Sequence, residues 1–328
     1  MTAAPRLSIV IPTLNRLAVA KRALDSALAQ TSDAIEILIS DNGSRDGTAA
    51  WLACVSDPRL RKFRHEHTMD VQSHGNFLIK QSRGDYFVGL SDDDWLDPGF
   101  AADVLALLDR HPGLPFVYTG CITHYAQSEV AALCGPERES GSDFLAAFFA
   151  GQREVCWCAV ASRMADMREI GPIPPGRIFG DMFFWTRLAR RGDVGCVARP
   201  LSHYSFVTED NLSSGTPVTA WAAETRLLAD EVLQAWPDPG ADPRRREQLD
   251  GLARDMHAFV ARSSANQFVW NALRGASRTT LWRSLPPLWP LLRRAPRVWP
   301  RLVLALALPR RWVRHLVLAA AARRGRQR

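Results

Sequence analysis

The C-terminal part of this 328-residue chain lacks acidic residues altogether. From Met256 to Arg328 there are fifteen arginines and no Asp or Glu, whereas the whole chain has 41 Lys and Arg and 34 Asp and Glu. The residues before Met256 therefore carry 26 basic and 34 acidic side chains, so an acidic body precedes a basic tail. A tail with one sign of charge predicts an anionic partner.

Long apolar runs are also missing from this tail. No stretch reaches the roughly 18 uncharged apolar residues that a transmembrane helix needs. Between Thr279 and His315, short apolar pieces alternate with Arg and Trp, which suits the headgroup region of a membrane. A helical lid or dimer contact is a second interpretation. Nucleic-acid binding is a third, and the dense Leu, Ala and Pro argue against it. We expect an anionic membrane surface as partner and no nucleic acid.

The cysteines are few and do not form a Cys-x-x-Cys pair. The chain is too large to depend on a disulfide scaffold, so we expect reduced and buried thiols. They are Cys54, Cys121, Cys134, Cys156, Cys158 and Cys196. A secretory signal is also missing, because only Leu7 to Ile11 is apolar between Arg6 and Pro12. These observations predict a cytoplasmic protein, peripheral at the inner face of the cell membrane through its tail.

Signatures of two enzyme classes are absent. The sequence has no Gly-x-Ser-x-Gly, and no single Cys stands near a base pattern, which argues against nucleophilic catalysis. It has no Gly-x-x-x-x-Gly-Lys loop, which argues against a phosphotransferase of the P-loop type.

The N-terminal part of the chain alternates predicted strands with predicted helices, as an α/β protein with a doubly wound, mostly parallel sheet does. Apolar runs predict strands at 7–11, 35–40, 60–65, 86–90, 115–119, 156–160 and 194–198. Helical spacing predicts helices at 17–29, 73–82, 98–110, 143–150, 181–191, 221–236 and 244–274. Residues 126–142 lack a pattern and predict a loop. We divide the chain into an α/β domain at 1–213 and a basic helical extension at 214–328.

The apolar run from Tyr86 to Leu90 leads, after Ser91, into Asp92, Asp93 and Asp94. In open α/β sheets, ligands bind outside the carboxyl ends of the strands. Three adjacent carboxylates repel one another, and a bound Mg²⁺ or Mn²⁺, which prefers oxygen ligands, would offset that repulsion. The alternative is a solvated acidic turn that caps the helix beginning at Pro98.

Polar residues follow two other predicted strands, at 12–16 and at 41–44. Five sequence motifs then occur in a specific order and spacing: SIVIPTLNR, ILISDNGSRDGT, HGN followed by RGDY, LSDDD, and GDMFFWTRLAR. With these motifs the chain resembles family 2 glycosyltransferases of the GT-A fold over about residues 6 to 213. Each motif alone would be weak, whereas the set is specific.

The resemblance implies a metal-dependent, inverting transfer of a sugar from a UDP- or dTDP-type donor. The acceptor would be a hydroxyl of a glycan or a lipid-linked molecule in cell-surface polysaccharide synthesis. A divalent cation would offset the charge of the leaving diphosphate. The rival interpretations are a nucleotidyltransferase and a non-catalytic relative that binds a nucleotide or glycan. A homo-oligomer is left open.

The resemblance also assigns roles to residues. Asp93 and Asp94 would bind the metal ion and Asp92 would lie near the ribose, although Ser91 stands at the usual first acidic position. Asp41 would contact the base of the nucleotide, with a turn or helix cap as the alternative. The nucleotide would be lined by Pro12, Thr13, Asn15, Arg16 and Ser44.

Three further residues have two interpretations each. Asp181, at the start of a predicted helix, would be the base that takes the proton of the acceptor hydroxyl, or a helix N-cap. As a base it would need partial desolvation, because a solvated carboxylate keeps an ordinary pKa. His203 would bind the metal ion or a phosphate, or would be structural. Asn76 would contact the donor or be a plain helix N-terminal group.

Overall fold

The computed structural model describes residues 4–125, 128–132, 134–206, 215–236, 243–274, 276–293, 296–309 and 312–313. The chain forms two compact units. The first consists of residues up to 124, with 129–145 and 153–205, and the second of 125–128, 146–152 and the residues from 206 onwards. The predicted boundary between residues 213 and 214 lies outside the described residues, within 207–214.

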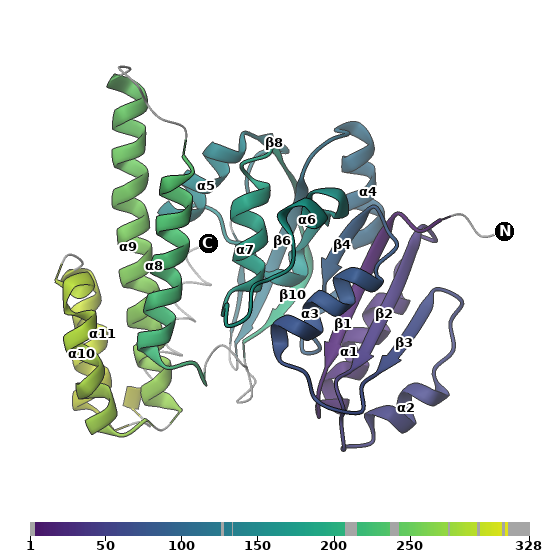
Figure 1. The fold of residues 1–328 in the computed structure, drawn as a ribbon, viewed down its shortest axis with the longest axis horizontal. Coiled ribbons are helices and arrows are strands. Elements are labelled where there is room, and N and C mark those ends of the chain that lie inside the picture. Colours follow the sequence, from purple (N-terminus) through teal and green to yellow (C-terminus); the bar gives the residue numbers. More distant parts are fainter. Residues whose placement is uncertain are drawn as a thin grey trace. The chain divides into compact units, whose positions relative to one another are not determined.

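The first unit contains a sheet of ten strands in the described part of the chain, in the order β3-β2-β1-β4-β9-β6-β10-β5, with β7 beside β6 and β8 beside β10 (Figure 1). The strands are β1 (Leu7–Thr13), β2 (Ile35–Asp41), β3 (Leu60–Arg64), β4 (Tyr86–Gly89), β5 (Trp95–Leu96), β6 (Phe116–Tyr125), β7 (Ser128–Ala131), β8 (Arg138–Glu139), β9 (Val160–Arg163) and β10 (Val194–Ser205). Strands β3, β2, β1 and β4 are parallel, as predicted. Beyond them β9 runs antiparallel to both β4 and β6.

Helices flank this sheet (Figure 1). They are α1 (Leu17–Leu28), α2 (Thr48–Cys54), α3 (Val71–Gln81), α4 (Phe100–Arg110), α5 (Gly141–Ala150), α6 (Met164–Ile170) and α7 (Gly180–Leu188). One face of α1 is fully buried and consists mostly of small side chains, namely Ala20, Ala23, Leu24 and Ala27. Because these side chains are short, the helix can pack closely on the sheet. The predicted α/β fold with a helical C-terminal region is therefore confirmed.

The parallel register brings three strand ends to one edge. Thr13, the last residue of β1, lies opposite Asp41, the last residue of β2. On the other side of β1, Val10 lies opposite Gly89, where β4 ends. The side chains of β1 and β2 are buried along nearly their whole length, which explains why their sequences are continuous apolar runs rather than alternating ones.

The structure corrects four predictions made from local patterns. The strand predicted at 156–160 is a 3₁₀ turn (Trp157–Ala159) followed by β9. The predicted loop at 126–142 contains β7 and β8, which pair with neighbouring strands that a local pattern cannot reveal. The strand predicted at 194–198 is the first part of a longer strand, β10, whose register shifts around Pro200, since Pro cannot donate a ladder hydrogen bond. Cys54 is exposed at the end of α2 rather than buried; all six thiols are free.

The second unit is helical. Its helices are α8 (Val218–Gln234), α9 (Pro243–Leu273), α10 (Arg278–Leu292) and α11 (Trp299–Ala307), with a 3₁₀ turn at Pro296–Val298. Helices α8 and α9 occur within a few residues of their predicted positions. A core of Phe268, Leu281, Leu288, Leu292 and Leu302 joins α9, α10 and α11. Within the described ranges, no helix is both long and apolar enough to cross a membrane.

Candidate functional site

The loops after β1, β2 and β4 meet through hydrogen bonds between their polar residues. The Thr13 hydroxyl donates to Asp92 Oδ2 over 2.8 Å. This bond joins the first loop to Asp92, Asp93 and Asp94, called the acidic run below. The Asn15 amide donates to Ser44 Oγ over 2.8 Å, which joins the first loop to the second. Asn15 has a φ of 53°, a left-handed conformation that Asn tolerates better than most residues. The predicted convergence of these loops is therefore present.

Arg16 bridges two carboxylates of the acidic run. Its Nη1 lies 2.7 Å from Asp92 Oδ1, and its Nη2 lies 2.7 Å from Asp93 Oδ2. Arg22, from α1, donates to the Asp93 carbonyl oxygen over 2.6 Å and lies over the ring of Trp95. The fork of a guanidinium matches two acceptors at a fixed spacing, so Arg16 holds the two carboxylates in one arrangement.

Burial shifts the protonation of the acidic run. It raises the pKa of Asp92 to about 6, although Arg16 and the hydrogen bond from Thr13 act in the opposite direction. It raises the pKa of Asp94 well above its usual range, and the charge of Asp93 adds to this effect. The charge of Arg16 therefore does not offset the cost of ionising Asp92, and Asp94 is costly to ionise as well.

The side chain of Asp94 points into the protein interior. This differs from the alternative interpretation of the acidic run as a solvated turn. Its side chain is fully buried, and Oδ1 accepts the backbone amide of Ser205 in β10 over 2.9 Å. Its Oδ2 has no hydrogen-bond partner among the described residues. A buried carboxylate oxygen without a donor is costly, so this atom can accept a cation or a proton.

Asp41 is fully buried at the end of β2. Its Oδ1 accepts the amide of Ser44 over 2.8 Å, which is the turn interaction that the alternative interpretation requires. Its Oδ2 has no hydrogen-bond partner in the described ranges and lies 3.7 Å from Arg64 Nε. Ser44 and Arg64 also line an open depression of about 450 Å³ beside this loop. The turn role is thus present, and one oxygen remains for a further partner.

Asp181 lies in the first turn of α7, whose N-cap is Phe179. Its Oδ1 accepts the amide of Met182 over 2.7 Å, and burial raises its pKa to about 6. Its described contacts do not include the acidic run. The partial desolvation that a base requires is therefore present, while the N-cap position itself belongs to another residue.

The side chains of Asn76 and His203 are occupied by protein partners. Asn76 Nδ2 donates to the carbonyl of Ile173, and its Oδ1 accepts the amide of the same residue. The ring nitrogens of His203 lie 2.9 Å from His124 Nε2 and 3.1 Å from Asp97 Oδ1, and the ring stacks on Trp95. A ligand role for either residue would require one of these bonds to open, and both roles stay predictions.

The residues that form this site lie in a segment that matches a known protein family. Residues 8–146 match the model of Glycosyl transferase family 2. These residues form a family 2 glycosyltransferase domain. The match includes every predicted site residue before β7, from Pro12 to Asp94, whereas Asp181 and His203 lie outside it.

Curated relatives are similar over short segments of the glycosyltransferase domain. An uncharacterised glycosyltransferase of Rickettsia felis is 40% identical over 107 residues, which cover 32% of this chain and 18% of that protein. The GalNAc(5)-diNAcBac-PP-undecaprenol β-1,3-glucosyltransferase of Campylobacter jejuni is 26% identical over 156 residues, 45% of this chain and 50% of that protein. The chain spans half or less of the length of the curated relatives it matches.

Solved structures show the same fold at low sequence identity. S. aureus TarS 1–349 in complex with UDP-GlcNAc has a TM-score of 0.60 at 14% identity, and the alignment covers 87% of this chain and 91% of that one. The mannosyltransferase PcManGT from Pyrobaculum calidifontis, in complex with GDP-Man and Mn²⁺, has a TM-score of 0.56 at 15% identity, covering 93% and 86%. The glycosyltransferase domain therefore has the GT-A fold.

The chemistry of the acidic side chains suits a divalent cation, although Asp93 faces Arg16 and Asp94 faces β10. Asp93 and Asp94 offer carboxylate oxygens, the ligand type that Mg²⁺ and Mn²⁺ prefer. Oδ2 of Asp94 has no hydrogen-bond partner among the described residues, and the pKa values of Asp92 and Asp94 stay raised although Arg16 and Arg22 lie beside them. We therefore judge that these residues suit the predicted ion.

Sequence reasoning missed Arg22, Trp95 and Ser205, which support the acidic run. Arg22 is one basic residue on a helix, and such residues usually face solvent. Ser205 acts through its backbone amide, which no residue type reveals. Trp95 directly follows the acidic run, and its position was the only available signal.

Proposed function

We propose that this chain is a glycosyltransferase that moves a sugar from a nucleotide-linked donor to a hydroxyl group. One observation supports this proposal most strongly. After the carboxyl ends of β1 and β4, Thr13 and Arg16 bind Asp92, and Arg16 also binds Asp93. These contacts lie within the family 2 domain. Neighbours of the same fold bind UDP-GlcNAc and GDP-Man, which supports a nucleotide-sugar donor.

The donor would lie across the loops after β1 and β2. We propose a UDP- or dTDP-type nucleotide whose base contacts Asp41 and whose ribose lies near Asp92. Oδ2 of Asp41, which has no hydrogen-bond partner in the described ranges and lies 3.7 Å from Arg64 Nε, and the depression beside Ser44 support this placement. Pro12, Thr13 and Asn15 would contact the nucleotide mostly through backbone groups, and Arg16 can turn from the carboxylates to the diphosphate.

Asp93 and Asp94 would hold a Mg²⁺ or Mn²⁺ ion. When bound, this ion supplies positive charge that stabilises the nucleoside diphosphate as it leaves. The chain holds both carboxylates in place before ligands bind: Arg16 pairs with Asp93 until a diphosphate draws the guanidinium away, and the Ser205 amide orients Asp94. His203 remains a third predicted ligand, and Asn76 a predicted donor contact.

Asp181 would act as the base of an inverting transfer. With a pKa of about 6 it is mostly ionised near neutral pH and can still take a proton readily, which is the compromise that general base catalysis needs. The proton would pass from the acceptor hydroxyl to the carboxylate of Asp181. The amide of Met182 fixes one oxygen and leaves the other for the acceptor.

The acceptor would be a glycan or a lipid-linked molecule in cell-surface polysaccharide synthesis. The Campylobacter relative is named for an undecaprenol-linked substrate, and a Myxococcus xanthus relative is named as an O-antigen biosynthesis protein. The first name supports a lipid-linked acceptor, and the second supports a role in cell-surface polysaccharide synthesis.

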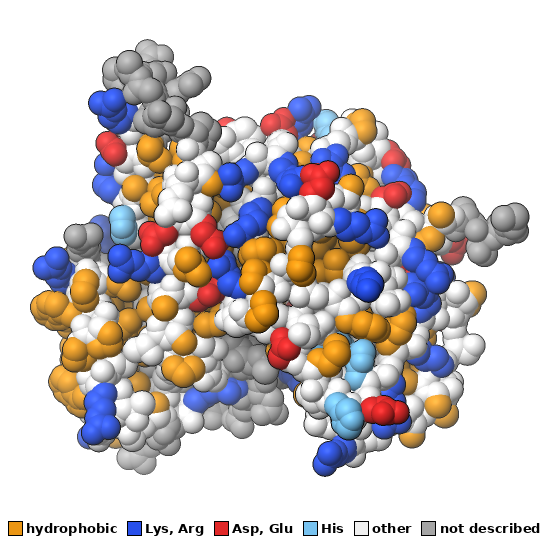
Figure 2. Space-filling model, in the orientation of Figure 1, with side chains coloured by type: hydrophobic (Ala, Val, Ile, Leu, Met, Phe, Trp, Pro, Cys, Tyr) orange, Lys and Arg blue, Asp and Glu red, His pale blue; other side chains and the backbone are white. Residues whose placement is uncertain are grey.

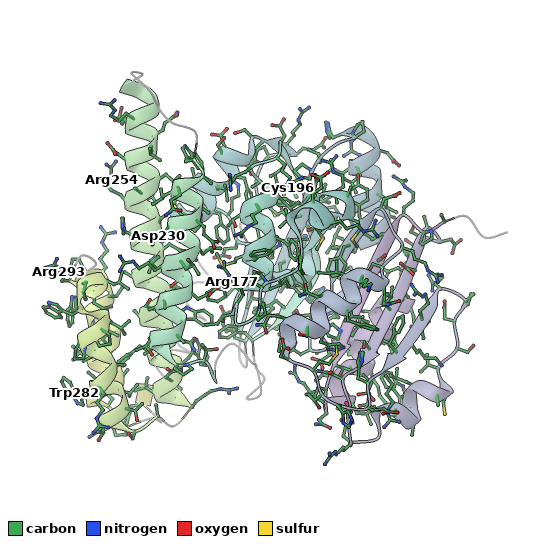
Figure 3. The ribbon with its side chains drawn as sticks, in the orientation of Figure 1. Arg177, Cys196, Asp230, Arg254, Trp282 and Arg293 are labelled. Atoms are coloured by element: carbon green, nitrogen blue, oxygen red, sulfur yellow. The ribbon has the colours of Figure 1, made fainter. Side chains whose placement is uncertain are left out.

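The helical unit would contact an anionic membrane surface from the cytoplasmic side. Trp282 and Trp289 of α10 are 60% and 53% exposed; Arg283 of the same helix and Arg293, which directly follows it, are exposed as well. Figure 2 shows hydrophobic and basic side chains together over α10 and α11, and Figure 3 labels Trp282 and Arg293 at the two ends of α10. Exposed Trp beside Arg is typical of a headgroup interface, where lipid phosphates pair with the basic side chains.

Calorimetry with UDP, with and without Mn²⁺, followed by a donor-hydrolysis assay, tests the proposal. We expect Mn²⁺-dependent binding and release of a nucleoside diphosphate. Pyrophosphate release would instead indicate a nucleotidyltransferase, and binding without turnover of any nucleotide sugar would indicate a non-catalytic relative.

The variant Asp93→Ala should lower turnover by about two orders of magnitude or more, because it removes a group that stabilises the departing charge. Asp109→Ala is the matched control, since Asp109 is an exposed carboxylate on α4 that pairs only with Arg6 among the described residues. Equal turnover in both variants would contradict the metal assignment.

A further inference from the structure

Three cysteine side chains meet in the first unit, outside the proposed donor site. Cys121 lies on β6, and Cys156 and Cys158 flank Trp157 in the turn before β9. The Sγ atom of Cys156 lies 2.7 Å from that of Cys121 and 3.5 Å from that of Cys158. Cys121 and Cys158 are buried, whereas Cys156 is half-buried, so the pair of Cys121 and Cys156 borders the solvent through Cys156.

The turn that carries these thiols packs against the acidic run. The indole of Trp157 lies so close to Gly89, the last residue of β4, that a Cβ at that position would overlap it. The charge of Asp94 acts on the thiols of both Cys156 and Cys158. A covalent change in this cluster would therefore occur directly beside the proposed metal site.

The spacing of the sulfur atoms favours a covalent bond over a shared metal ion. A disulfide has an S–S distance of about 2.05 Å, so Cys121 and Cys156 need to approach by less than 1 Å. Thiolates around a tetrahedral zinc ion, each about 2.3 Å from it, lie well over 3 Å apart. In the described part of the chain the cluster has three members, and no fourth His, Cys, Asp or Glu completes it.

We propose that Cys121 and Cys156 form a reversible disulfide, with hydrogen peroxide as the oxidant. The Cys121 thiolate, which accepts a hydrogen bond from Cys156, would attack one peroxide oxygen, so that an S–O bond forms, the O–O bond breaks and hydroxide leaves. The hydroxide would take the proton of the Cys156 thiol and become the first water. The Cys156 sulfur would then attack the Cys121 sulfur, so that the S–S bond forms, the S–O bond breaks and a second water leaves after protonation. Two thiols lose two electrons in total, and one peroxide becomes two waters. Reversible disulfides of this kind occur in reducing compartments.

Peptide mapping of the full-length protein tests this inference. The protein is treated with a few equivalents of peroxide, denatured, alkylated and digested without reductant. We expect a cross-linked pair of peptides containing Cys121 and Cys156, which dithiothreitol removes. The melting temperature of the oxidised protein should rise by several degrees, because the bond closes a loop of 35 residues in the unfolded chain.

Two variants serve as controls. Cys156→Ser should lose the cross-link, and Cys54→Ser should keep it, since Cys54 lies exposed on α2 away from the cluster. Oxidation of Cys54 in folded protein that leaves Cys121 and Cys156 open to alkylation would overturn the proposal. A Cys156–Cys158 link, or a purified protein that carries a thiolate-bound metal ion and resists peroxide, would overturn it as well.

Discussion

Replacing Asp181 by Asn separates a catalytic base from a residue that only supports the start of a helix. Asn has nearly the same size and shape as Asp, so a purely structural role predicts little change in turnover. As the base, Asp181 would lose its ability to take a proton, and Asp181→Asn should lower turnover by two orders of magnitude or more. Donor binding should stay nearly intact, because the base does not hold the donor.

The same substitution should make the protein more stable at high pH. Burial raises the pKa of Asp181 from 3.8 to about 6, which corresponds to a cost of about 3 kcal/mol for holding the ionised carboxyl in the fold. A raised pKa means that the native state takes up the proton before the unfolded state does. Wild-type stability relative to the Asn variant is therefore lowest above pH 7, increases as pH falls through 6, and levels off below 4. Because the side chain is only half-buried, we expect about 1–3 kcal/mol at pH 8.

Urea unfolding at pH 8 and at pH 4, together with turnover at pH 8, measures this prediction. Asp103→Asn is the matched control, since Asp103 also lies in the first turn of a helix but pairs with Arg199. It should keep turnover and gain no stability at pH 8. An Asp181→Asn protein with full turnover, or one less stable than wild type at pH 8, would refute the reasoning.

Two further predictions concern packing and the membrane. Gly89→Ala should destabilise the protein by about 1–3 kcal/mol or more, because the new methyl group overlaps Trp157, while Gly99→Ala meets no atom within 4 Å and should be nearly neutral in thermal unfolding. The double variant Trp282→Ser and Trp289→Ser should reduce flotation with anionic liposomes several-fold, since it removes exposed indoles from the proposed interface. Leu227→Ser, at an exposed position on α8, is its control, and unchanged flotation of the Trp variant would count against membrane contact.

The sequence was sufficient to predict the strands whose loops form the proposed donor site. Strands β1 and β2 are continuous apolar runs that end in polar turns, and this local signal survives because both faces of each strand are buried. The pairing of the later strands was not predictable in this way. Strand β9 lies antiparallel between β4 and β6, and such long-range neighbours leave no local pattern.

The individual roles within the acidic run could not be predicted from residue type. Asp92, Asp93 and Asp94 are identical in chemistry, but adjacent side chains point in different directions. Asp92 and Asp93 face Arg16, whereas Asp94 faces the backbone of β10. The pairing of His203 with Asp97 likewise joins residues 106 positions apart, and a sequence motif gives no indication of it.

The bridge from Arg16 to Asp92 and Asp93 has a consequence for the order of ligand binding. A dication that arrives alone must compete with a guanidinium already in place, so its affinity for the free protein should be weak. A diphosphate that binds together with the dication can pair with the Arg16 guanidinium instead. The carboxylates of Asp92 and Asp93 are then released to bind the dication. Nucleotide and ion would thus strengthen each other's binding by the same factor, since coupling between two ligands is reciprocal.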